Sequence, residues 1–168
     1  MTTPDPLQRA KRPRTVLAGP YGHPFHPIAV TIPIGAWTAS IVFDLIGFFV
    51  EDATPWAIGA QVLIAIGVVG ALLAAVLGFL DFSIIPSGLP AHRTALLHMS
   101  LNLAITVLFA VNWFVRSGED HDHVSIVGFV LSIVGLAILG ISGWLGGKLA
   151  YQYGVRVADE QTQRQGYV

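Results

Sequence analysis

The chain has 168 residues and a net charge of −1; 54% of its residues are hydrophobic and only 11% are charged. Its mean hydropathy of +0.67 is typical of a membrane protein rather than of a soluble domain. The near-neutral charge gives no basic footprint for nucleic-acid binding. The chain has no cysteine, which excludes disulfides, thiolate metal sites, Cys-ligated iron–sulfur clusters and haem attached through a CxxCH motif.

Both ends of the chain are polar. Residues 1–22 are rich in proline and carry the basic residues Arg9, Lys11, Arg12 and Arg14. This composition predicts a disordered arm that lies near anionic lipid headgroups. Residues 155–168 are predicted to form a polar, flexible C-terminal tail.

Four apolar segments lie between the two ends, and each exceeds the roughly 20 residues that a helix needs to cross about 30 Å of hydrocarbon. They predict an all-α integral membrane protein, a four-transmembrane-helix bundle within residues 23–154. The predicted spans are 27–50, 56–80, 92–115 and 124–149.

Small residues recur every four positions in two of these spans. The second span contains two such series, Gly67, Ala71 and Ala75 and also Gly70, Ala74 and Gly78, and the fourth span contains Gly143 and Gly147. Small residues at this spacing let helix backbones approach each other in lipid. Close helix packing is therefore expected, within one chain or between chains, although no longer sequence repeat is evident.

Basic residues predict the orientation. The arm, Arg93, Lys148 and Arg156 fall on one side of the predicted bundle, and the acidic loops fall on the other side with Arg116. Because cytoplasmic loops carry the excess of Lys and Arg, both termini are expected in the cytoplasm. The chain is expected to be a multi-pass protein of the bacterial cytoplasmic (inner) membrane.

Two histidines lie at the entrance to the first span, in the motif His23-Pro24-Phe25-His26-Pro27. Each proline restricts the residue before it to extended conformations. Both imidazoles are therefore held stiffly and are candidate metal ligands. The alternative is a rigid entry turn with interfacial histidines.

The third span carries His98 two turns after its start, about 10 Å along the helix. Thr94 precedes it and Asn102 follows it by one turn, so the three form a polar stripe that must face the bundle interior. His98 is a candidate metal ligand whose second ring nitrogen is oriented by a hydrogen bond. The alternative is a hydrogen bond between helices. His92, at the start of the same span, is a further candidate.

Charged residues near the span ends are candidate supporting groups. Asp81 ends the second span, where it could neutralise Arg93 or accept a hydrogen bond from a histidine. Asp44 lies inside the first span and could pair with a polar group of the third span such as Asn112. Pro33 should kink the first span.

A further candidate metal motif occurs in the third connector. His121-Asp122-His123 alternates metal-ligating residue types in an acidic loop. Alternating residues in an exposed loop are weakly specific for a metal, so a solvated loop is favoured.

Four stretches carry a family resemblance: GHPFHPIAVTIPIGAWTASIVFDL, GFLDFSIIP, AHRTALLHMSLN and GWLGGKLAYQYGVRV, in that order within residues 22–157. The chain resembles DUF2231, a family of small bacterial integral membrane proteins of unknown function. The resemblance implies a four-helix membrane domain. Some relatives carry a Rieske iron–sulfur domain after the last motif, which favours electron transfer by analogy. Lys148 stands where some relatives are expected to have histidine, which weakens a ligand role there.

The leading hypothesis is a redox subunit that binds haem b or another His-ligated metal between the first and third spans. His26 and His98 are the expected ligands, with His23 and His92 as alternates; neutral imidazole suits iron and copper. No hydrolytic or phosphoryl-transfer motif is present, so the chain is not expected to be an enzyme on its own.

Two other functions stay open. One is a cofactor-free structural or accessory subunit that packs against a respiratory or other redox membrane partner. The other is a small proton or ion pathway through Asp44, Asn102 and His98. The lipid bilayer is the expected surrounding partner, a homodimer is compatible with the sequence, and no nucleic-acid partner is expected.

Overall fold

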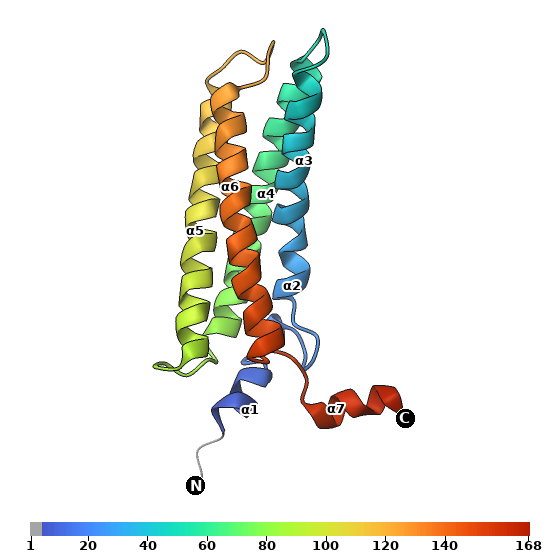
Figure 1. The fold of residues 1–168 in the computed structure, drawn as a ribbon, viewed down its shortest axis with the longest axis vertical. Helices are drawn as coiled ribbons and strands as arrows, with labels where there is room; N and C mark the ends of the chain where they lie inside the picture. Colours follow the sequence, from blue (N-terminus) through green and yellow to red (C-terminus); the bar gives the residue numbers. More distant parts are fainter. Residues whose placement is uncertain (1–4) are drawn as a thin grey trace.

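Four long helices form an upright bundle with both chain termini at one end (Figure 1). The structure is a computed structural model and describes residues 5–168. The long helices are α3 (Thr31–Gly47), α4 (Thr54–Phe82), α5 (Pro90–Ser117) and α6 (Ile126–Gly147). Shorter elements are α1 (Pro6–Lys11), η1 (Val16–Ala18), α2 (His26–Ala29), the π-helical turn η2 (Lys148–Gln152), α7 (Glu160–Arg164) and η3 (Gln165–Tyr167).

The long helices are apolar enough to cross a membrane. The four candidate spans have mean hydropathies between 1.7 and 2.8, yet only 17% to 33% of each apolar window is buried inside the bundle. Large aliphatic and aromatic side chains such as Val69, Phe114 and Trp144 therefore point outward, where lipid would cover them. The predicted four-helix membrane fold is confirmed. The spans are His26–Gly47, Thr54–Phe82, Pro90–Ser117 and Ile126–Gln152.

The helices alternate in direction, and α3 lies diagonally opposite α5. We call the end with both termini the terminal end, and the end with the α3–α4 and α5–α6 connections the far end (Figure 1). Both α3 and α5 run from the terminal end to the far end. Their core-facing side chains Trp37, Ile105 and Phe109 meet in a buried cluster that also contains Ile64 of α4.

Local sequence explains several helix ends. Proline lies in the first turn of α4 and of α5, where a missing N–H costs nothing. The Ser125 side chain caps α6 by accepting a hydrogen bond from the Gly128 N–H at 3.0 Å. The first span divides into α2 and α3 at Val30, one turn before Pro33, because the proline ring crowds the preceding turn.

The two polar ends of the chain pack against each other at the terminal end. We call residues 5–22 and 153–168 the terminal collar. The arm over residues 1–22 was predicted to be disordered; residues 1–4 lie outside the described part, and residues 5–22 instead form α1 and η1 and contact the C-terminal segment. The Arg156 N–H donates to the Ala10 carbonyl at 3.0 Å, and Tyr21 donates its hydroxyl hydrogen to Asp159 at 2.9 Å. Each segment thus supplies partners for polar groups of the other, which the composition of either one alone does not reveal.

Candidate functional site

Three pairs of residues meet in the bundle core between the first span and α5. His26 and His98 form a histidine layer near the terminal end. Trp37 and Phe109 form an aromatic layer in the middle, and Asp44 and Arg116 form an ionic layer near the far end.

In the histidine layer, the rings of His26 and His98 lie with their centroids 6.4 Å apart and their planes at 87°. The Nδ1 of His26 is 2.9 Å from the Ala74 carbonyl oxygen on α4, and the Nδ1 of His98 is 2.8 Å from the Ser142 carbonyl oxygen on α6. A carbonyl oxygen only accepts, so each Nδ1 carries the ring hydrogen and each neutral ring keeps an acceptor Nε2. Metal-ligating histidines are commonly oriented in this way.

Asn102 and Ser142 add a polar contact on the His98 side. The Asn102 amide donates to the Ser142 hydroxyl at 2.7 Å and to the His98 carbonyl at 2.8 Å. Its nitrogen is almost equidistant from the two ring nitrogens of His98, at 3.4 and 3.3 Å. It therefore lies over the ring or at its Cε1 edge, and not along the Nε2 lone pair. Of the predicted polar stripe, His98 and Asn102 face the bundle interior, where both contact Ser142 of α6.

Two glycines make room for the imidazoles. A Cβ at Gly78 would lie 2.9 Å from Cε1 of His26, and a Cβ at Gly146 would lie 3.1 Å from Cε1 of His98. Both distances are shorter than ordinary van der Waals contact, so each ring fits closely against a bare helix backbone. Close packing by small residues of α4 was expected. A Cβ at Gly143 of α6, by contrast, would meet nothing within 4 Å.

The two histidines lie at the same level although the sequence places them at different depths in their spans. The helix of α5 begins at Pro90, two turns before His98, whereas His26 begins α2. The segment before His26 contains Gly19 and Gly22 at positive φ instead of a long helix, and its short helix η1 contacts α4.

The other two candidate histidines do not join this pair. His92 packs against Phe82, with ring centroids 4.9 Å apart. His23 is exposed, and its Nδ1 is 3.5 Å from the Tyr21 carbonyl. Within residues 5–168, no three His, Asp or Glu side chains gather into a metal-ligating group.

The aromatic layer separates the polar groups at the two ends. Trp37 stacks on Phe109 with centroids 4.1 Å apart and planes at 6°, and Trp37 donates its Nε1 hydrogen to the Ile64 carbonyl at 3.3 Å. Both rings and the neighbouring Ile64 and Ile105 are at most 2% exposed. Asp44 therefore does not form one continuous polar path with the histidine layer.

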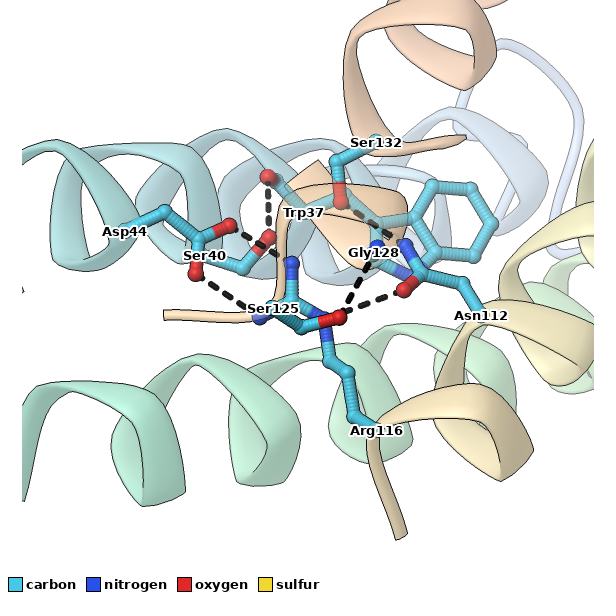
Figure 2. Close-up of polar contacts among 8 residues, drawn as sticks. All are labelled: Trp37, Ser40, Asp44, Asn112, Arg116, Ser125, Gly128 and Ser132. Atoms are coloured by element: carbon cyan, nitrogen blue, oxygen red, sulfur yellow. Dashed lines mark hydrogen bonds and ion pairs between the residues drawn. The ribbon is translucent and has the colours of Figure 1, made fainter. Parts of the chain in front are cut away.

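The ionic layer is a fully buried network (Figure 2). Arg116 donates to both carboxylate oxygens of Asp44, at 2.7 and 2.6 Å, and its Nε donates to the Asn112 oxygen at 3.0 Å. Asn112 in turn donates to the Ser132 hydroxyl at 2.8 Å. Asp44 is 0% and Arg116 3% exposed. The paired geometry and the neutral amide satisfy charges that would otherwise be costly to bury.

Sequence reasoning named Asp44 but treated Arg116 only as an orientation signal. Asp44 was expected to meet Asn112, and it reaches that residue only through the guanidinium of Arg116. A usable signal was present, because Asp44 follows His26 by the same number of residues as Arg116 follows His98.

Asp81 pairs with the C-terminal segment rather than with Arg93, which lies at the other side of the α4–α5 connection. The Asp81 carboxylate is 2.7 Å from Nε of Arg156, although the N–H is not aimed for a hydrogen bond. Arg156 also donates from Nη2 to the carbonyls of Ala18 and Gly19, at 2.8 and 3.0 Å. Arg156 belongs to the terminal collar, and Asp81 lies at the end of α4. Their ion pair therefore attaches the collar to this helix.

The loop histidines of the far end do not converge. His121 bonds through Nε2 to the Gln61 side chain at 2.6 Å, and His123 pairs with its neighbour Asp122. The two rings thus have separate partners on different segments.

Comparison with known families found one match. The model of a family described as a predicted membrane protein, DUF2231, matches residues 22–159, a range that contains all three layers. No curated protein and no solved structure matches the chain.

Proposed function

The chain belongs to the DUF2231 family of predicted membrane proteins, and we propose that it binds one metal ion between His26 and His98 as a redox subunit of the membrane. One observation carries the proposal. Two histidines from separate helices meet in the core, each with Nδ1 committed to a backbone carbonyl and Nε2 left as an acceptor.

The number of donors points to the class of metal. Structural zinc takes four protein ligands, whereas Cu(I) accepts two imidazoles in a line. A metal bound by both Nε2 atoms at about 2 Å would hold the ring centroids roughly 6 Å apart, close to the 6.4 Å between His26 and His98. A singly charged ion also costs less to bury among neutral ligands than a divalent one. Cu(I) is therefore the favoured occupant.

Haem b is the second candidate, because haem iron also needs only two axial ligands from the protein. The same pair of imidazoles favours it. A porphyrin disc would have to enter between rings that already pack against Gly78 and Gly146. It would therefore require α2 and α4 to separate from α5 and α6, whereas a bare ion requires no such separation.

The proposed orientation puts the terminal end in the bacterial cytoplasm. Basic residues of the collar lie at that end, and Glu51 and Asp52 lie at the far end. Because the chain has no native cysteine, single cysteines at Ser87 and Asp120 report each end. A membrane-impermeant thiol reagent applied to intact cells should label the Asp120→Cys variant and spare the Ser87→Cys variant. The reverse pattern would overturn the orientation.

The metal proposal is tested by anaerobic titration of purified protein in mild detergent with Cu(I) against a chromogenic competing chelator. We expect one Cu(I) per chain, confirmed by elemental analysis. His26→Ala and His98→Ala should each weaken binding at least tenfold. His92→Ala is the matched control, because it removes a histidine of the same helix outside the pair, and it should bind as the native chain does.

The same preparations are titrated with haemin and recorded before and after dithionite reduction. A Soret band that is lost in both His26→Ala and His98→Ala would identify haem b, and not copper, as the bound group. Binding of neither, or binding unchanged in both histidine variants that remain monodisperse, would overturn it. A cofactor-free accessory subunit would then be the remaining function, and copurifying membrane proteins would identify its partner.

A further inference from the structure

The three facing pairs of the core have a constant spacing in the sequence. The numbers of the two residues differ by 72 in the histidine, aromatic and ionic layers alike. A constant offset means that the first span and α5 present the same register to the core. Ser40 and Asn112, which lie beside the ionic layer, have the same offset.

The second helices of the two hairpins repeat this relation with an offset of 68. His26 bonds to the Ala74 carbonyl and His98 to that of Ser142. Gly78 packs on His26 as Gly146 packs on His98.

The aromatic layer behaves in the same way. Gly67 contacts the ring of Trp37, and Gly135 contacts the ring of Phe109. The offset falls from 72 to 68 because α4 has four additional residues, about one helical turn, at its start. Both second helices begin ten residues after the ionic-layer residue (44 to 54 and 116 to 126), but Ile58, the counterpart of the first residue of α6, lies four residues inside α4.

Residue identities support the alignment in the second helices. Identical pairs at this offset are Ile58 and Ile126, Val62 and Val130, Leu63 and Leu131, Gly67 and Gly135, Leu77 and Leu145, and Gly78 and Gly146. In the first helices, from His26 to Gly47, only the histidine is identical to its counterpart. The one side chain retained there is the proposed ligand.

Helix directions complete the relation. Both α3 and α5 leave the terminal end, and both α4 and α6 return to it (Figure 1). Two hairpins that run in the same direction are related by an axis along the membrane normal, as parallel repeats of membrane proteins are.

We infer that the bundle is two copies of one helical hairpin, α2–α4 and α5–α6, which meet on a pseudo-two-fold axis and share a single ligand at the histidine layer. The shared ligand rests on the proposed function; the duplication does not. Each hairpin is the docking partner of the other.

Complementary charge at the ionic layer distinguishes the two copies. Asp44 and Arg116 occupy equivalent positions but carry opposite charges. The ionic layer is therefore neutral when a first hairpin packs against a second hairpin, and it would be charged if two identical hairpins packed together. The space beside each of the two charged residues also differs. Gly128 leaves room for the guanidinium of Arg116, because a Cβ at Gly128 would lie 2.5 Å from Nε of Arg116. The equivalent position beside Asp44 is Ala60, which is 0% exposed.

Exchange of the ionic layer in the full-length, metal-free chain tests the duplication. Asp44→Arg and Arg116→Asp alone should each yield aggregated protein, and the double exchange should recover a monodisperse one. In the double exchange, Ala60→Gly should raise Tm, because the guanidinium now at position 44 gains the space that Gly128 gives Arg116. In the native background, Ala60→Gly should lower Tm, as glycine does in a helix. A lower Tm in both backgrounds would overturn the equivalence of positions 60 and 128.

A conservative exchange covers the case in which the charge variants do not fold. Trp37→Phe with Phe109→Trp moves the indole to the equivalent position, where Gly135 gives it space and the carbonyl of residue 132 replaces that of Ile64. We expect the exchange to have a Tm within a few degrees of the native value. Phe109→Trp alone should lower Tm further, because two indoles then face each other. An exchange less stable than this single variant would contradict the two-fold relation.

Copper stoichiometry tests the shared ligand separately. One Cu(I) per chain, lost in either histidine variant, supports a ligand on the axis. Two Cu(I) per chain, each dependent on one histidine, would overturn the shared ligand. The duplication would then be judged from the exchange variants alone.

Discussion

At the scale of residues, the core holds ionisable groups that are expensive inside a membrane unless their polar atoms have partners. His26 and His98 each meet a backbone carbonyl through Nδ1. Asp44 and Arg116 neutralise each other with two hydrogen bonds. The ion pair is internally satisfied, whereas each imidazole retains an acceptor nitrogen. The histidine layer is therefore the one of the two that is suited to binding a ligand.

Loss of one partner of the ionic layer should destabilise the protein strongly. Asp44→Ala leaves the buried Arg116 charge unpaired, and we expect a loss of about 3–5 kcal/mol in the free energy of unfolding. Replacement of both residues by apolar ones, Asp44→Leu with Arg116→Met, should cost much less, because no unpaired charge remains. Unfolding by SDS from mixed micelles measures both. Equal losses in the single and double variants would contradict a purely paired role.

The glycines that pack against the histidines, Gly78 and Gly146, leave no space for an added methyl group. Gly146→Ala puts a Cβ against His98, and we expect a loss of about 1–3 kcal/mol from overpacking, together with weaker Cu(I) binding. Gly140→Ala is the matched control on the same helix, since a Cβ there meets nothing within 4 Å. It should be neutral or slightly stabilising. Comparable losses at positions 140 and 146 would show that the His98 contact is unimportant.

Residue type alone identified most of the candidate site. His26 and His98 were recognised because an ionisable residue is rare within a span and usually functional. Their convergence could not be predicted, because it depends on the ordered segment before His26, which was expected to be disordered and instead packs against α4 through η1. Arg116 was missed because a basic residue at a span end usually serves as an orientation signal.

At the scale of elements, the terminal collar joins segments from opposite ends of the chain. Arg156 is its central residue: it is 3% exposed, has a φ of 62°, and contacts Asp81, Ala18 and Gly19. A non-glycine residue at positive φ is costly, and these contacts supply the compensation. The four spans were predictable from long apolar runs. The collar was not, because its order depends on contacts between two segments that are each polar.

Docking of α7 to the arm should depend on pH only in acid. The pKa of Asp159 is lowered from its usual value, first by the hydrogen bond from the Thr162 N–H and then by that from Tyr21. The Thr162 bond caps α7, and the Tyr21 bond joins α7 to the arm. The contribution of the Tyr21 bond to docking is full above the usual value of 3.8 and is lost as the pH falls through the lowered pKa.

A fluorophore on a cysteine introduced at Gln165 measures this docking through its anisotropy. Anisotropy should stay constant from about pH 8 to pH 5 and fall only below about pH 4. Asp159→Asn is the matched control, because the amide does not titrate in this range; its anisotropy should show no such step. A step near neutral pH in the native chain would assign docking to another group.

At the scale of the whole molecule, the bundle combines a two-fold core with a lipid-facing exterior. The first helices of the two hairpins share only the histidine, and the offset changes between the first and second helices. A repeat this diverged was not evident in the sequence and becomes visible only when contacts align the residues. The exterior needs no such register, because lipid accepts any large apolar side chain.

The molecule also holds its polar groups in two separate levels. The aromatic layer and its isoleucine neighbours close the core between them. This arrangement favours a bound ion at one level over a proton or ion pathway through both. His26 and His98 are therefore expected to act together as one ligand pair.

X-ray absorption at the copper K edge of the Cu(I)-loaded protein tests this pairing most directly. It should show two imidazole nitrogen donors about 2 Å from the metal and an edge feature typical of linear two-coordinate Cu(I). The signal should be absent in His26→Ala and in His98→Ala. A sulfur donor, which would have to come from Met1 or Met99 because the chain has no cysteine, or a site with three or four donors would contradict the pairing.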